Sequence, residues 1–273
     1  MEPRLEFDGN SGGEIHSGLL KDPTKKGQYL DRFGKVVVGE NSESEQKFSE
    51  GLAVRRVGEK VGYVGEDGKF LIQPRFSYGS EFKDGMAKVL LEGDCLMFSN
   101  EGECNMHTIV GNSLRKDLPD CRIEYIDKSG VVVTNGQFKM AGSFSEGLAP
   151  VRVGELWGFI NKRGALEIEA QFEEAWSFSD GLARIRQNLL IGYVDRNGKV
   201  LIQAQYDSAE DFHEGFAVVE VGEFRFRYID KSGRYALGGE YEAASPFFKG
   251  LAHVKQGKRF SYIDTTGKVM FQY

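Results

Sequence analysis

The sequence predicts an all-β protein built from tandem antiparallel β-repeats of about 34 residues. Two short motifs, each containing glycine, recur along the chain at a nearly constant interval. Between them, apolar and polar residues alternate with the period of two that is typical of strands with one buried face. The composition agrees, because 35 glycines and 12% aromatic residues suit many short strands joined by tight turns.

The first motif is an aromatic residue, two further residues, and then Gly-Leu-Ala or a close variant. It runs, for example, from Phe48 to Ala53. Its glycines are Gly51, Gly85, Gly147, Gly181, Gly215 and Gly250. A fainter copy, Gly18-Leu19-Leu20, lies 33 residues before Gly51. We therefore expect the repeats to fill nearly the whole chain.

The second motif is Tyr or Phe, an aliphatic residue, usually Asp or Asn, two residues and then Gly. Its glycines are Gly34, Gly68, Gly102, Gly130, Gly164, Gly198, Gly233 and Gly267. They are separated by 34, 34, 28, 34, 34, 35 and 34 residues, which predicts about eight units. An Asp that opens a turn can accept a hydrogen bond from the amide two residues on, and Gly supplies the positive φ, so this motif predicts a tight turn.

Each unit is expected to hold three strands. After Gly-Leu-Ala, alternate apolar positions such as Ala217, Val219 and Val221 predict the first strand. The second strand ends at the tight turn, and a third follows, as in Lys199–Gln203. An aromatic residue, an Ala and a Phe then recur at spacings of three. That spacing predicts either a short fourth strand or a single helical turn.

A single repeat domain over residues 1–273, with an irregular fourth unit near 103–130, is the expected organisation. A propeller-like ring is the preferred arrangement because closure hides the edges of the sheets. An elongated β-solenoid is the alternative, because units of about 34 residues are short for a four-stranded blade.

The charge and the apolar pattern exclude several classes of function. The formal charge is -6 and the basic residues are spread along the chain. The sequence therefore lacks the basic stripe that is typical of nucleic-acid binding proteins. The apolar runs are only a few residues long, as in Val36–Val38, which predicts no membrane span. No secretory signal follows Met1–Arg4, and three cysteines are an odd count, so we expect a cytoplasmic protein unless a leader has been removed.

The segment Glu155–Asn161, which contains Trp157-Gly158, resembles the WG repeat, as does the upstream Phe144–Ala149. The resemblance covers roughly residues 15–273. It implies a repeat fold from a mostly bacterial family that lacks a common assigned activity and is generally taken to mediate interactions. Other units depart from the naming dipeptide: two have Val61-Gly62 and Ile191-Gly192, and the glycine is lost at Arg227 and Ser261.

The 28-residue step between Gly102 and Gly130 is where the repeat breaks, and all three cysteines lie around it. Cys95, Cys104 and Cys121 together with His107 could complete a tetrahedral zinc site. Cys104 and His107 could also form a nucleophile and its base. The alternative is that these are ordinary thiols and an ordinary imidazole. We expect no metal, no cofactor and no catalytic residue, and these four residues are the candidates should a site exist.

Three functions compete on the sequence alone. The leading hypothesis is a non-enzymatic protein-interaction module, or scaffold, that uses the repeat surface. The alternative is binding of carbohydrate or cell-wall polymer, for which the recurring tyrosines Tyr63, Tyr125, Tyr193, Tyr228 and Tyr262 would be stacking platforms if exposed. The third is metal-binding or hydrolytic chemistry in the irregular unit.

Basic residues on the polar side of the first strands suggest one further surface. These are Arg55, Arg56, Arg152, Arg184 and Arg186. Stacked units would bring them into a row that an acidic partner or an anionic glycan could contact. The alternative is the ordinary outward face of a half-buried sheet.

Overall fold

The computed structural model describes residues 47–91, 123–134 and 138–272, together with the backbone of three short strands nearer the N-terminus. The chain divides into two compact units, Met1–Gln46 and Lys47–Tyr273, where the sequence predicts one domain. In the first unit, β1 (Leu20–Lys21), β2 (Tyr29–Leu30) and β3 (Val36–Val38) form a three-stranded antiparallel sheet. No helix among the described residues is long and apolar enough to cross a membrane.

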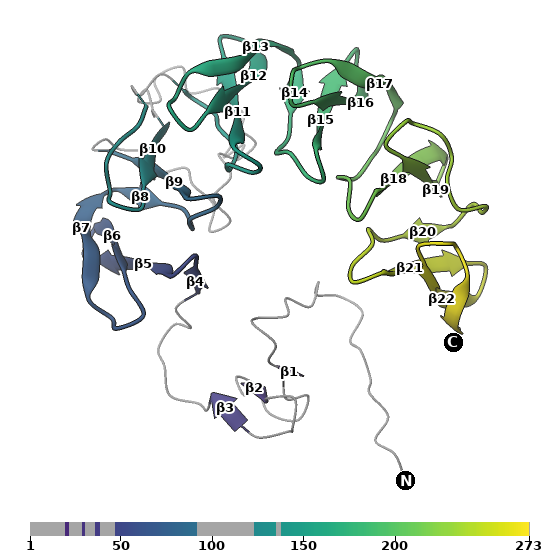
Figure 1. The fold of residues 1–273 in the computed structure, drawn as a ribbon, viewed down its shortest axis with the longest axis horizontal. Coiled ribbons are helices and arrows are strands. Elements are labelled where there is room, and N and C mark those ends of the chain that lie inside the picture. Colours follow the sequence, from purple (N-terminus) through teal and green to yellow (C-terminus); the bar gives the residue numbers. More distant parts are fainter. Residues whose placement is uncertain are drawn as a thin grey trace, which may run out of the picture. The chain divides into compact units, whose positions relative to one another are not determined.

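The second unit contains six small antiparallel sheets that follow one another along an arc (Figure 1). The first sheet has β4 (Phe48–Ser49), β5 (Leu52–Val57), β6 (Lys60–Val64) and β7 (Phe70–Phe76). The second has β8 (Tyr78–Gly79), β9 (Met86–Leu90) and β10 (Ile123–Asp127). The third has β11 (Leu148–Val153), β12 (Leu156–Asn161) and β13 (Leu166–Phe172).

The remaining sheets repeat the same plan. The fourth has β14 (Glu174–Ala175), β15 (Leu182–Gln187), β16 (Leu190–Asp195) and β17 (Val200–Tyr206). The fifth has β18 (Phe216–Gly222) and β19 (Arg225–Asp230). The sixth has β20 (Ala243–Ala244), β21 (Leu251–Gln256), β22 (Arg259–Asp264) and β23 (Val269–Gln272). The predicted all-β class with tandem antiparallel units is therefore confirmed.

The segment left open between a fourth strand and a helical turn forms a short strand. β14 directly follows β13, the last strand of the third sheet. It pairs with β15 of the fourth sheet, where Ala175 lies opposite Ile185. β8 and β20 pair with β9 and β21 in the same way. The connections before the third and fifth sheets make only isolated bridges at this position, Ala141 with Val151 and Ala209 with Val219.

The glycine of the second strand is required by the path of the third strand. A Cβ on Gly192 would lie 2.6 Å from both the Ala204 nitrogen and the Ile202 oxygen of β17. The register between β16 and β17 shifts at this point, because the third strand bulges over the glycine. The recurrence of this glycine is thus a consequence of backbone contact within one sheet.

Two units that replace this glycine lose the regular third strand. After Glu124, the described residues 131–134 and 138 pair with β10 through isolated bridges alone, as at Ile126 and Val132. Where Arg227 stands, β19 likewise pairs with the residues that follow it through isolated bridges, at Tyr235 and Tyr241. Ser261 is small enough that β23 still pairs with β22. Among the described residues, a continuous third strand is thus present with Gly or Ser at this position and absent with Glu or Arg.

The core lies between successive sheets. Tyr193 and Ile202 of the fourth sheet pack in one cluster with Ala217, Val219 and Ile229 of the fifth. Corresponding clusters join the first sheet to the second, the second to the third, the third to the fourth and the fifth to the sixth. Each sheet shields the apolar face of its neighbour, as expected of a repeat whose units cannot bury that face alone.

The irregular region differs from the sequence-based expectation. β9 pairs with β10 from Met86 opposite Asp127 to Leu90 opposite Ile123. The opening at Gly85 and the turn at Gly130 therefore belong to one sheet, so the later part of the expected fourth unit completes the second sheet. Residues 92–122, with Gly102, lie between its two strands in the sequence and outside the described residues. Seven sheets are described, where the spacing of the turn glycines predicts about eight units.

Candidate functional site

The turn before each first strand is a two-residue hairpin loop with both residues in the left-handed region. In the first sheet, Glu50 has φ 53° and Gly51 has φ 84°. The residue at the Glu50 position is acidic in five sheets and is Lys249 in the sixth: Glu50, Asp84, Glu146, Asp180, Glu214, Lys249. Asp-Gly satisfies the local preference for this turn, but Glu-Gly does so less well, because Glu rarely adopts a left-handed conformation. A second cause must therefore select the acid.

That cause is a contact between neighbouring sheets, which we name the inter-sheet clasp. The carboxylate of each acidic turn residue accepts a hydrogen bond from the backbone N–H of the turn glycine of the following sheet. The pairs are Glu50–Gly85 at 2.9 Å, Asp84–Gly147 at 2.5 Å, Glu146–Gly181 at 3.1 Å, Asp180–Gly215 at 2.5 Å and Glu214–Gly250 at 2.8 Å. The five clasps thus join the six sheets, each of the first five to the one that follows it.

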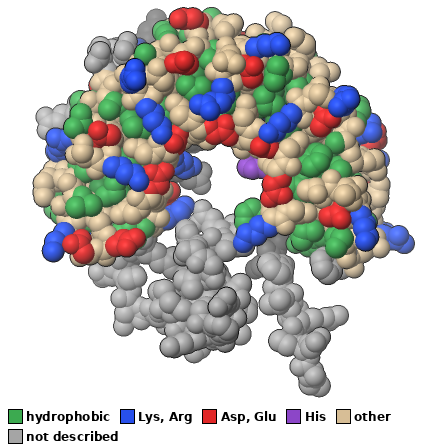
Figure 2. All heavy atoms as spheres, in the orientation of Figure 1, with side chains coloured by type: hydrophobic (Ala, Val, Ile, Leu, Met, Phe, Trp, Pro, Cys, Tyr) green, Lys and Arg blue, Asp and Glu red, His purple; other side chains and the backbone are tan. Residues whose placement is uncertain are grey.

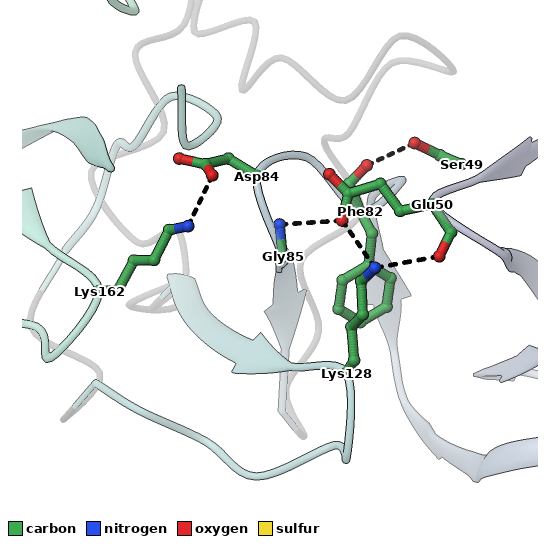
Figure 3. A network of polar contacts seen from close by, with 7 residues as sticks. All are labelled: Ser49, Glu50, Phe82, Asp84, Gly85, Lys128 and Lys162. Atoms are coloured by element: carbon green, nitrogen blue, oxygen red, sulfur yellow. Dashed lines mark hydrogen bonds and ion pairs between the residues drawn. The ribbon is translucent and has the colours of Figure 1, made fainter. Parts of the chain in front are cut away.

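A lysine completes three of the clasps. It comes from the turn between the second and third strands of the following sheet. Lys128 Nζ lies 3.1 Å from the Glu50 carboxylate and also donates to the Glu50 carbonyl at 3.1 Å (Figure 3). Lys162 contacts Asp84 at 2.6 Å, also drawn in Figure 3, and Lys231 contacts Asp180 at 2.7 Å.

The clasp shifts the titration of its carboxylates. Partial burial by itself raises the pKa of Glu50, but hydrogen bonds from Lys128 and from the Gly85 amide outweigh it and hold the pKa below its ordinary value. The same opposing causes leave the pKa values of Asp84 and Asp180 lowered. These carboxylates are consequently ionised near neutral pH, and they are engaged in joining the sheets.

The clasps border an open hollow of about 510 Å³. Its lining is rich in serine and carboxylate: Ser49, Glu50, Phe82, Lys83, Asp84, Ser143, Phe144, Ser145, Glu146, Ser177, Phe178, Ser179 and Asp211. Ser49 donates to the Phe82 carbonyl across the sheet boundary, as Figure 3 shows, and Ser179 donates to the Phe212 carbonyl at 2.7 Å. Much of this polar surface is already bonded within the protein.

The recurring tyrosines lie inside the protein, apart from Tyr262, which is half-buried. Tyr63, Tyr125, Tyr193 and Tyr228 are fully buried, and each hydroxyl donates to a backbone carbonyl 17 residues on. Tyr193, for example, donates to the Glu210 carbonyl at 2.7 Å and packs edge-on against Phe212. These four rings cannot stack on a sugar, so the carbohydrate hypothesis loses the platforms on which it was based.

Three of the five arginines in the predicted cationic row are paired with carboxylates. Arg184 lies 2.6 Å from Asp211 and also covers the Trp176 ring, and Arg186 lies 2.9 Å from Glu174. Arg152 lies 2.5 Å from Glu155, and Arg55 and Arg56 bond to backbone carbonyls. Figure 2 shows basic and acidic side chains intermixed over the visible face. The carboxylate partners of Arg152, Arg184 and Arg186 reduce the attraction that this part of the row would exert on an anion.

The tips of the hairpins between first and second strands expose apolar side chains in four sheets. We name this set the tip row: Val57, Val153, Leu156, Leu189 and Phe224. Leu189 and Phe224 are each 77% exposed, although both are large and apolar. Both also have a left-handed backbone, with φ 66° at Leu189 and φ 54° at Phe224. Single exposed apolar residues are ordinary, but this set recurs at equivalent turns of four sheets.

Carboxylates fix the two most exposed tips. Glu173 accepts from the Asn188 amide at 3.0 Å and from the Leu189 amide at 3.2 Å. Glu220 accepts from the Phe224 amide at 3.3 Å. The strained turns are thereby held in one conformation, and the side chains project from a fixed position.

The candidate metal residues Cys95, Cys104, His107 and Cys121 lie outside the described residues. Within the ranges that the structure does describe, no group of three or more His, Cys, Asp or Glu residues could hold a metal ion. The zinc and nucleophile hypotheses for the irregular region therefore stay predictions.

Sequence reasoning missed both the clasp and the tip row. The clasp has a readable signal, because an acid precedes the turn glycine in five of the six copies and a basic residue follows the turn Asp or Asn in four. The tip row has a weaker signal, since its members are ordinary apolar residues whose exposure depends on where the hairpin turns.

Five segments of the chain match the family model described as the WG containing repeat: residues 62–94, 125–157, 157–188, 191–223 and 226–260. No curated protein matches the chain in sequence. Among solved structures, the WD40 β-propeller domain of Doa1 is 11% identical, with a TM-score of 0.32, and the match covers 79% of this chain and 65% of that one. BamB from Moraxella catarrhalis is 10% identical, with a TM-score of 0.41, and the match covers 89% of this chain and 74% of that one.

Proposed function

We propose that this chain, which belongs to the WG containing repeat family, is a protein-interaction module that binds its partner through the tip row. The observation that carries the proposal is the exposure of Leu189 and Phe224 on strained, carboxylate-held turns. A left-handed Leu or Phe costs about 1 kcal/mol or more, and Asn or Gly at the same place would avoid that cost. A cost of this kind is typical of sites that are kept for function.

The chemistry of the tip row favours a protein as the partner. Aliphatic and aromatic side chains that project from a rigid support can insert into apolar pockets of a protein partner. The carboxylates nearest these tips are already bonded to the turn amides, so they support the anchors. We expect no catalytic activity and no cofactor.

The test uses the double variant Leu189→Asn/Phe224→Asn. Asn tolerates the left-handed conformation, so the variant should unfold at the same temperature as the unchanged protein or slightly above it. The immobilised variant should nevertheless lose the proteins that the unchanged chain captures from an extract of its native cells. Far-ultraviolet circular dichroism establishes that both proteins are folded.

The matched control is Leu71→Gln, which removes an apolar side chain that is 64% exposed on β7, away from the hairpin tips. This variant should capture the same proteins as the unchanged chain. If the double variant still captures the full set, or if Leu71→Gln loses the same proteins, the tip row is not the binding surface.

A further inference from the structure

At the two ends of the series of six sheets, the residues equivalent to the clasp residues have the opposite charge to those in the inner sheets. The residue after the turn Asp or Asn is basic in the second to fifth sheets: Lys128, Lys162, Arg196, Lys231. In the first sheet the equivalent residue, in the turn Gly65–Gly68, is Glu66. In the last sheet the clasp residue is Lys249, where the other five sheets have an acid. The two exchanges are complementary.

The exchanged side chains can make the same contact as an internal clasp. Between the first and second sheets, the ammonium of Lys128 reaches the carboxylate of Glu50 at 3.1 Å (Figure 3). Placing Lys at the clasp position and Glu in the turn leaves the combined length of the two side chains unchanged. A last sheet that stands before a first sheet, as neighbours do along the chain, would therefore bring Lys249 to Glu66.

Both residues are exposed, and neither forms an ion pair with any described part of the chain. Lys249 lies over the ring of Phe248, which is itself 59% exposed. Figure 1 places the first sheet, β4–β7, and the last sheet, β20–β23, at the two ends of the arc. In the sequence, the residue before the glycine of the faint repeat opening at Gly18 is the uncharged Ser17.

We propose that the last sheet of one copy docks on the first sheet of a second copy, head to tail, through an ion pair between Lys249 and Glu66. Phe248 lies beside this pair and becomes covered in the contact. The reversed charges also set the register. Lys249 would repel the basic turn residues of the inner sheets, so only the first sheet is a suitable acceptor. A contact of this kind joins unlike surfaces and builds a ring or a filament of copies.

Sedimentation of the full chain over a range of concentrations tests the proposal. The unchanged protein should associate reversibly, and more weakly as the salt concentration rises. Lys249→Glu and Glu66→Lys should each raise the dissociation constant by about tenfold or more, since like charges would then face each other. The double variant Lys249→Glu/Glu66→Lys should associate as the unchanged protein does.

An equimolar mixture of the two single variants is the most discriminating experiment. Each single variant associates weakly with itself but complements the other at both ends, so mixing should restore association with the two chains in alternation. Glu59→Lys and Lys258→Glu are the matched controls, because they change the same charges at exposed hairpin tips. These two should associate normally.

Three outcomes overturn the proposal. The unchanged protein could remain monomeric at every concentration, or the single variants could associate as tightly as it does. In the third outcome, the single variants stay monomeric but melt at lower temperature, the double variant recovers, and mixing has no effect. That result would place the Lys249–Glu66 contact within one chain.

Discussion

Replacing Gly158 by Ala tests the physical origin of the repeat's most characteristic residue. The added Cβ would lie 2.5 Å from the Ile168 oxygen, 2.8 Å from the Ala170 nitrogen and 2.9 Å from the Ala170 Cα. All three atoms belong to the backbone of β13, whose register on β12 is fixed on both sides, at Phe172 and at Ile168. No side chain can rotate to make room, so β13 itself must move.

The expected loss of stability follows from that movement. Overpacking a well-fitted site costs about 1–3 kcal/mol, and each strand hydrogen bond that is lengthened or lost adds about 0.5–1.5 kcal/mol. We expect Gly158→Ala to lower the free energy of unfolding by about 3 kcal/mol. For a chain of this size, that corresponds to a fall in melting temperature of roughly 6–12 °C, measured by calorimetry on the full chain.

Gly222→Ala is the matched control, because a Cβ at Gly222 meets nothing within 4 Å and its φ is outside the left-handed range. It should change the free energy of unfolding by no more than about 0.5 kcal/mol. If the two variants melt at the same temperature, close approach of the third strand is not the reason for glycine at Gly158. The bulge would then have to be explained by the turn or by the neighbouring sheet.

The remaining predictions concern the bonds between sheets. Tyr193→Phe should cost about 1 kcal/mol, because the Glu210 carbonyl loses its donor while the ring packing remains, whereas Tyr193→Leu should cost more. Asp180→Asn removes the ion pair with Lys231 and should cost about 1 kcal/mol, since both side chains are partly exposed. The clasp carboxylates with lowered pKa values stabilise the fold fully above their ordinary values of 3.8 to 4.5. The melting temperature should therefore be flat above about pH 5 and fall as acid protonates them, with a smaller fall in Asp180→Asn.

Periodicity alone was enough to predict the fold class. The alternation in segments such as Ala217–Val221 and the turns such as Tyr125–Gly130 are local features, so the sequence reports them directly. Pairing between distant segments is different. β9 and β10 pair with each other although residues 92–122 separate them in the sequence. The regular spacing of the glycines instead predicted that Gly85 and Gly130 belong to separate units. An insertion inside a hairpin cannot be distinguished by spacing from a shortened repeat.

The candidate surfaces were harder to predict because each depends on which face a residue takes. Tyr63 and its counterparts could serve either as sugar platforms or as core, and only the packing of a following sheet shows that they are core. The basic row was placed on the polar face of the strands, but its acidic partners, such as Asp211 for Arg184, come from other strands or loops. Charge in the sequence could be counted, whereas its neutralisation depended on tertiary contact.

The acidic residue of the turn offers a test in which one substitution should act in opposite directions. Asn suits the left-handed turn position better than Glu or Lys, so the change to Asn stabilises the turn itself. At Glu214 it also removes a charge-assisted hydrogen bond to the Gly250 amide, and such bonds contribute about 1.5–3 kcal/mol. At Lys249 there is no clasp acid to lose.

Glu214→Asn should therefore lower the melting temperature, by roughly 2–4 °C for a net loss of about 1 kcal/mol, while Lys249→Asn should raise it slightly. Both are measured at low protein concentration, where association between copies does not contribute. If both variants become more stable, the acid before the turn glycine adds nothing to the joining of the sheets. Its recurrence would then reflect the turn alone, but three of the five acids are Glu, which the turn does not favour.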